Sequence, residues 1–123
     1  MSMRQILTRT ALVAAFSLSS ALALDLSGNY KVTGTNADGT AYRGMLEIKK
    51  VGVDIYSMRW KDSKSMIQIG TGMYKNGYLA AGYTSEKEKS CGVAMYALEG
   101  SKTLRGSWTA CGSSKLGTEV AQR

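Results

Sequence analysis

The sequence predicts an all-β protein, a small antiparallel up-and-down β-barrel of about eight strands. Three observations predict this fold. Short segments in which apolar and polar residues alternate with a period of two recur along the chain, and no stretch longer than about ten residues shows a helical stripe. The connections between the segments are short, which favours a meander of consecutive strands. Closure of that meander into a barrel would remove the two exposed sheet edges.

The alternating segments place the strands in order along the chain. We expect them at residues 29–35, 40–49, 55–60, 66–74, 78–83, 92–98, 104–111 and 117–121. Clusters of Gly, Asn, Asp and Ser separate them, as expected of a chain with 14 Gly and no Pro. The strongest hairpin signals are Asp38-Gly39 and Asn76-Gly77, because both pairs tolerate the positive φ of tight turns.

The two cysteines, Cys91 and Cys111, are predicted to form a disulfide between neighbouring strands. If Leu98 pairs with Leu104 across the turn between them, Cys91 lies directly opposite Cys111, and opposed Cβ atoms are close to bridging distance. The same register sets large residues against small ones on the inner face: Tyr96 against Gly106 and Trp108 against Ala94. The alternative, a redox pair, has no Cys-x-x-Cys spacing to support it.

Six large aromatic residues alternate with outward polar residues, so their rings are expected to converge in or near the barrel mouth. Two interpretations stay open, because barrels of about eight strands either fill with side chains or hold one small ligand. The rings form a plain core, or they line a pocket in which their polar tips bind a ring compound. The six residues are Tyr30, Tyr42, Tyr56, Trp60, Tyr96 and Trp108.

Two glycines, Gly44 and Gly106, fall on the same inner face. A missing side chain there makes room for a neighbouring ring or lets a strand bend. On the other face, Met45 and Met95 are expected to point outward. Exposed methionine is adaptable and occurs at promiscuous binding surfaces, and it serves equally to cover a sheet edge.

The residue types argue against catalysis. The chain contains no histidine, which removes the commonest general base and the usual zinc and copper ligands. Nearly all acidic residues are expected in turns or on the solvent face, as turn-forming and solvating groups. They are Asp25, Asp38, Glu47, Asp54, Asp62, Glu86, Glu88, Glu99 and Glu119. We therefore expect no enzyme, no cofactor and no metal.

The charge balance is basic but dispersed. The chain has 16 Lys and Arg against 9 Asp and Glu, a net charge of +7, and two of the basic residues, Arg4 and Arg9, lie in the first 23. The others are scattered along the chain, whereas nucleic-acid binding usually needs a clustered basic stripe. We expect a solvated surface, or weak attraction to acidic glycans, anionic lipid head groups or an acidic protein, and no nucleic-acid partner.

Residues 1–23 are predicted to be an export signal. Basic Arg4 and Arg9 precede an apolar run at 11–18, and Ala21-Leu22-Ala23 supplies small residues for cleavage after Ala23. The run is too short to span a bilayer, which takes roughly 20 apolar residues. Residues 24–123 are then expected to form a single domain that is periplasmic or secreted.

A set of turn and core motifs lies along residues 24–123: residues 28–39, Tyr42-x-Gly44, Trp60, Gly92-Val93-x-x-Tyr96, Leu104-x-Gly106-x-Trp108-Thr109 and residues 117–120. Together these motifs resemble a family of small exported bacterial proteins, some of which carry the label fibronectin-binding protein. The resemblance spans nearly all of residues 24–123 and implies a non-enzymatic secreted or periplasmic protein. The architecture is also similar to avidins and lipocalins in miniature.

These observations favour a non-catalytic binding module for a macromolecule, such as the host matrix protein fibronectin. A second hypothesis is a carrier of a small apolar or aromatic ligand in the barrel interior. A third is a structural envelope protein. The residues leave the identity of any partner and the oligomeric state open.

Overall fold

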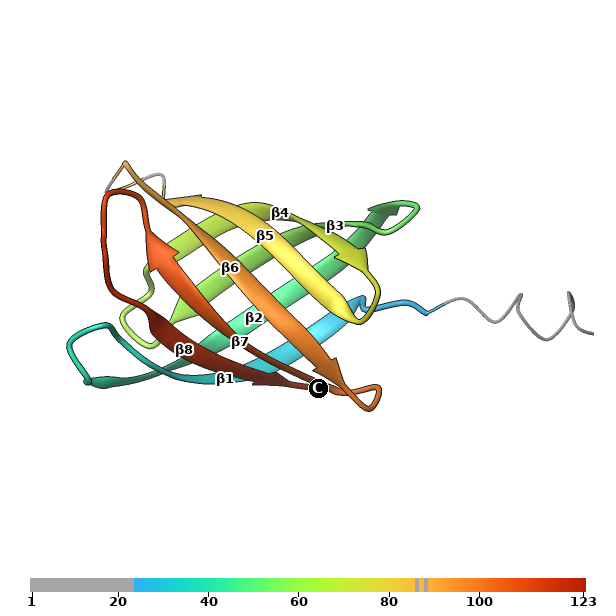
Figure 1. Cartoon of the computed structure of the whole chain (residues 1–123), viewed down its shortest axis with the longest axis horizontal. Helices are drawn as coiled ribbons and strands as arrows, with labels where there is room; N and C mark the ends of the chain where they lie inside the picture. The colour runs from blue at the N-terminus through green and yellow to red at the C-terminus, as the bar shows by residue number, and fades with distance from the viewer. Residues whose placement is uncertain (1–23, 86, 88) are drawn as a thin grey trace, which may run out of the picture.

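A computed structural model describes residues 24–85, 87 and 89–123, and the predicted export signal lies outside the described residues. The described chain is a closed barrel of eight antiparallel strands in sequential order, β1 to β8 (Figure 1). Of the described residues, none belongs to a helix long and apolar enough to cross a membrane. The strands are β1 (Gly28–Thr35), β2 (Ala41–Gly52), β3 (Ile55–Asp62), β4 (Ile67–Lys75), β5 (Tyr78–Ser85), β6 (Ser90–Glu99), β7 (Thr103–Ala110) and β8 (Gly117–Gln122).

The barrel closes through β8, which pairs with β7 on one side and with β1 on the other. All eight predicted strands are confirmed, and none of their ends differs from the prediction by more than three residues. Inward and outward residues alternate along the strands, as in Tyr56, Met58 and Trp60, which are all buried and separated by exposed residues. Closure leaves no unpaired sheet edge in the described chain, which explains how so small a domain tolerates long strands.

The two predicted hairpin turns form in different ways. Asn76 and Gly77 both have positive φ, as a two-residue turn requires. In the other connection only Gly39 has positive φ. Asp38 instead accepts hydrogen bonds from the backbone N–H and the hydroxyl of Thr40, so this segment is a longer loop between β1 and β2.

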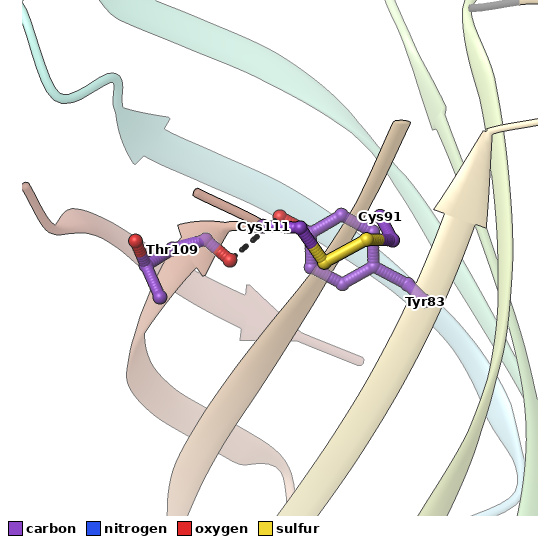
Figure 2. Close-up of a disulfide and its surroundings, with 4 residues drawn as sticks. All are labelled: Tyr83, Cys91, Thr109 and Cys111. Atoms are coloured by element: carbon purple, nitrogen blue, oxygen red, sulfur yellow. Dashed lines mark hydrogen bonds between the residues drawn. A yellow bond between two sulfur atoms is a disulfide. The ribbon is translucent and has the colours of Figure 1, made fainter. Parts of the chain in front are cut away.

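The predicted disulfide and register are confirmed. Cys91 and Cys111 are bonded, with their Cα atoms 5.2 Å apart. On the same strand pair, Leu98 pairs with Leu104 and Tyr96 with Gly106. Beside the bridge, the hydroxyl of Tyr83 donates a hydrogen bond of 3.3 Å to the carbonyl of Thr109 (Figure 2). The disulfide therefore joins β6 to the loop that follows β7.

The two ends of the barrel differ. One end carries the tight turns β2–β3, β4–β5 and β6–β7 together with the segment before β1, and the other carries the longer connections (Figure 1). At the tight-turn end Leu26 is completely buried. Its carbonyl accepts a hydrogen bond from the Tyr30 hydroxyl, and its N–H donates one to the Tyr56 hydroxyl. Arg123 donates to the carbonyl of Ser27 and lies 5.4 Å from the Tyr30 ring. This end is closed.

Candidate functional site

An interior cavity of about 410 Å³ lies toward the end with the longer loops. Its mouth includes exposed residues of the β1–β2 and β3–β4 connections, among them Asn36 and Lys64. The inner part of the cavity is lined mainly by aromatic side chains and contains one carboxyl group. The deep lining residues are Tyr42, Trp60, Tyr83, Ala94, Tyr96, Trp108 and Glu119.

The expectation that nearly all carboxylates lie in turns or on the solvent face is wrong for Glu119, which is only 6% exposed. It points into the barrel from β8, on the same face of the strand as the buried Gly117 and Ala121. Its Oε1 accepts a hydrogen bond of 2.7 Å from the hydroxyl of Tyr42. Its Oε2 accepts from the Tyr96 hydroxyl and, at 3.3 Å, from the indole N–H of Trp60.

Strand register explains why this carboxyl fits inside the barrel. Glu119 pairs with Gly34 on β1 and with Gly106 on β7, so both of its sheet neighbours lack side chains. Each glycine also faces a tyrosine on its other side: Gly34 pairs with Tyr42, and Gly106 pairs with Tyr96. The Tyr42 ring lies over Gly34, where an added Cβ atom would collide with it, and at Gly106 the backbones of β6 and β7 come close together. From these positions both tyrosine hydroxyls reach the carboxyl.

Burial governs the electrostatics of the site. It raises the pKa of the Glu119 carboxyl above its ordinary value, and the hydrogen bonds from Tyr96, Tyr42 and Trp60 oppose this shift. Burial also raises the pKa of Tyr42 and of Tyr96, and the neighbouring charge of Glu119 raises them further. Both hydroxyls consequently stay protonated and donate to the carboxylate.

The six predicted aromatic residues divide into two groups. Tyr42, Trp60, Tyr96 and Trp108 line the cavity, as expected for rings near the mouth. Tyr30 and Tyr56 do not lie near this mouth. Both are fully buried core residues, which agrees with the interpretation of these rings as core, and their hydroxyls bond to Leu26 at the closed end.

Tyr83 is a cavity residue that the sequence analysis missed. The available signal was its position two residues after Ala81 and four after Leu79, which places all three side chains on the inward face of β5. The same kind of signal marked Glu119, which shares the inward face of its strand with two small residues.

The aromatic side chains form two contacting pairs around the cavity. Tyr42 meets Trp108 edge to face, with ring centroids 6.2 Å apart. Trp60 and Tyr83 pack at a tilt, with centroids 5.8 Å apart. The indole N–H of Trp108 is buried without a hydrogen-bond partner among the described residues. The Trp108 ring lies over Gly117 of β8, where an added Cβ atom would meet the indole nitrogen and its neighbouring ring carbons.

A larger hollow of about 1110 Å³ lies along the barrel wall over β2 to β7. Its lining mixes outward side chains with inward residues, and it shares Tyr83, Ala94 and Trp108 with the smaller cavity. Met45 and Met95 are both exposed, as predicted; Met95 lines the larger hollow and Met45 the rim of the smaller cavity. We place the candidate site in the smaller cavity, because the buried aromatic rings and the only buried carboxyl among the described residues converge there.

The stability of the protein is expected to carry a pH signature of Glu119. Because its pKa is raised in the folded state, the folded protein binds this proton more tightly than the unfolded chain. The resulting stabilisation is complete below the ordinary pKa of 4.5 and is lost as pH rises through the folded pKa. Urea unfolding from about pH 7 down to about pH 4 should therefore show the wild type gaining stability relative to Glu119→Gln. A difference that stays constant with pH would contradict a raised pKa.

Comparisons with solved structures find designed β-barrels of the same architecture. A redesigned β-barrel has a TM-score of 0.72 at 20% sequence identity, covering 80% of this chain and 90% of its own. The redesigned barrel mFAP1, bound to DFHBI, has a TM-score of 0.70 at 19% identity, covering 80% and 94%. A de novo fluorescence-activating β-barrel has 0.66 at 13%, covering 79% and 92%. Identities this low show a shared fold and nothing more. No protein-family model and no curated protein matches this chain.

Proposed function

We propose that this protein is a non-enzymatic β-barrel that binds one small, ring-bearing ligand in its interior. The observation that carries the proposal is the cavity of about 410 Å³, which is lined by five aromatic side chains and a single buried carboxyl. Ligand pockets are typically concave, mostly apolar and equipped with a few converging polar groups. The complete absence of histidine from the chain supports binding rather than catalysis.

The shape of the barrel supports the same function. Leu26 and Arg123 close the end that carries the tight turns, so a ligand has one way in, past the longer loops. Two redesigned barrels with this fold, mFAP1 and mFAP0, are described as bound to DFHBI, so proteins of this fold can bind a small molecule.

The proposal is tested by filling the cavity. The probe is N-phenyl-1-naphthylamine, a neutral dye that becomes fluorescent in apolar surroundings. Ala94 is buried and lines the cavity, so Ala94→Leu places three extra carbon atoms where the dye would lie. We expect a saturable one-site titration with the wild type and an affinity at least about tenfold weaker with Ala94→Leu.

The matched control is Ala97→Leu, on the same strand and facing outward, which should bind the dye like the wild type. Urea unfolding of both variants separates loss of binding from loss of the fold. The proposal is wrong if the wild type gives no saturable signal, or if Ala94→Leu titrates like Ala97→Leu.

A second candidate function is binding of a matrix protein such as fibronectin through the outer face. Exposed apolar side chains on β4 and β6 favour it, and basic Arg59 lies next to Ile69 across the β3–β4 pair. An acidic and partly apolar protein surface would complement this face. Surface plasmon resonance on immobilised fibronectin should then show binding that Ile69→Asp abolishes. Absence of binding by the wild type, or equal binding by the variant, would exclude this candidate.

A further inference from the structure

We infer that the interior ligand is an organic cation, whose positively charged nitrogen sits among the aromatic rings and pairs with Glu119. This inference rests on the proposed function, because it concerns the same cavity. It adds the chemical class of the ligand, which neither the fold nor the solved structures of similar barrels supplies. Two features of the site carry it: an incompletely paired buried carboxyl, and an aromatic enclosure around it.

Glu119 is a buried acid with no basic partner. Among the described residues, the two ion pairs within 4 Å are Lys49–Glu47 and Arg105–Glu99, and neither involves Glu119. Its Oε2 accepts two hydrogen bonds, whereas Oε1 accepts bonds from Tyr42 alone and has room for another donor. A buried carboxylate is costly unless it is both paired and hydrogen-bonded. A cationic N–H group at Oε1 would meet both needs.

The rings around the carboxyl suit a cation as well. Five aromatic side chains from β2, β3, β5, β6 and β7 line the cavity. Aromatic faces attract positive charge through the quadrupole of the ring, and cages of several rings are the recurrent solution for recognising organic ammonium groups. An anionic ligand would be repelled by the charge of Glu119 and would gain no cation–π attraction from the rings.

The charged groups near the site are compatible with this inference. Two lysines stand at the mouth, but both are exposed to solvent, where salt screens their repulsion over about 8 Å. Asp62, at the same mouth, offsets part of their charge. The titratable and charged groups facing Glu119 or the cavity are Tyr42 from β2, Lys61 and Asp62 from β3, Lys64 from the β3–β4 connection, Tyr83 from β5 and Tyr96 from β6.

Three probes of similar shape test the inference: 2-phenylethylamine, which is cationic, 2-phenylethanol, which is neutral, and 3-phenylpropionate, which is anionic. The two tryptophans of the chain, Trp60 and Trp108, both line the cavity, so intrinsic fluorescence reports binding directly. At about pH 7 we expect the amine to bind at least about tenfold more tightly than the alcohol, and the carboxylate most weakly. Glu119→Gln should abolish this preference. Glu47→Gln, at a position on the outward face of β2, should leave the preference for the amine unchanged.

The pH dependence of the wild type tests the same inference without a variant. The preference for the amine should fade as pH falls through the pKa of Glu119, because protonation removes the charge that the amine pairs with. Equal binding of the amine and the alcohol, or tighter binding of the carboxylate, would overturn the inference while the naphthylamine titration still supported the proposed function. Failure of the naphthylamine titration as well would overturn both.

Discussion

Replacing Gly106 with alanine is expected to lower the free energy of unfolding by about 3 kcal/mol, measured by urea denaturation. A Cβ atom at this position would lie 2.8 Å from the carbonyl carbon of Met95 and 2.9 Å from the Cα of Tyr96, and closer still to the Met95 carbonyl oxygen. All three are backbone atoms of β6, so relief would require β6 and β7 to separate at the point where Tyr96 reaches Glu119.

The control for this prediction is Gly82→Ala. A Cβ atom at Gly82 meets nothing within 4 Å, because this glycine faces outward. Alanine in a strand is favoured over glycine by roughly 0.5–1 kcal/mol, so this variant should match or exceed the stability of the wild type. Equal stabilities of the two variants would mean that β6 and β7 do not approach as closely as described.

Removing the disulfide is expected to lower the free energy of unfolding by about 3 kcal/mol. Cys91 and Cys111 are 20 residues apart in the chain, and the bridge closes a loop of that length in the unfolded state. The double substitution Cys91→Ala and Cys111→Ala, compared with the wild type by urea denaturation under oxidising conditions, measures the effect.

Reduction of the wild type should produce a similar loss, and reductant should leave the double variant unchanged. An unchanged unfolding midpoint in the double variant would show that the disulfide does not stabilise the folded state relative to the unfolded chain. The size of the effect matters for this protein, since a domain of about 100 residues has only a modest core of its own.

Strand positions and register were predictable because they depend on local patterns. The alternation around Tyr96 and the position of the turn before Leu104 together imply the pairing that brings Cys91 opposite Cys111. A single register satisfied the large-against-small pattern and the disulfide at once. When independent constraints agree in this way, the strand register of a β-hairpin can be predicted from the sequence.

The position of Glu119 could not be predicted in the same way, because it depends on strands far apart in the chain. Glu119 and Val120 are adjacent and face opposite sides of β8, and of such a pair the apolar residue normally points inward. Only barrel closure places it beside Gly34, 85 residues earlier, and turns the carboxyl toward Tyr42. Without the closing β1–β8 pair, a solvent-exposed glutamate was the ordinary expectation.

The division of the aromatic residues had a related cause. Alternation identifies an inward side chain, but it does not tell at which end of the barrel that side chain lies. Tyr30 and Tyr56 pack at the closed end, where Leu26 of the segment before β1 is buried and hydrogen-bonded to both of their hydroxyls. That segment has no alternating pattern, so neither its position nor the resulting asymmetry between the two ends was visible in the sequence.

The central claim, that a ring-bearing ligand occupies the barrel interior, is tested most directly by nuclear magnetic resonance of the ¹⁵N-labelled protein titrated with N-phenyl-1-naphthylamine. The indole N–H signals of Trp60 and Trp108 report on the cavity, and the backbone signals of Val93 and Thr71 report on the outer face. The account predicts large saturable shifts of both indole signals and small shifts of the outer-face signals. Shifts concentrated on the outer face, with unchanged indole signals, would contradict it.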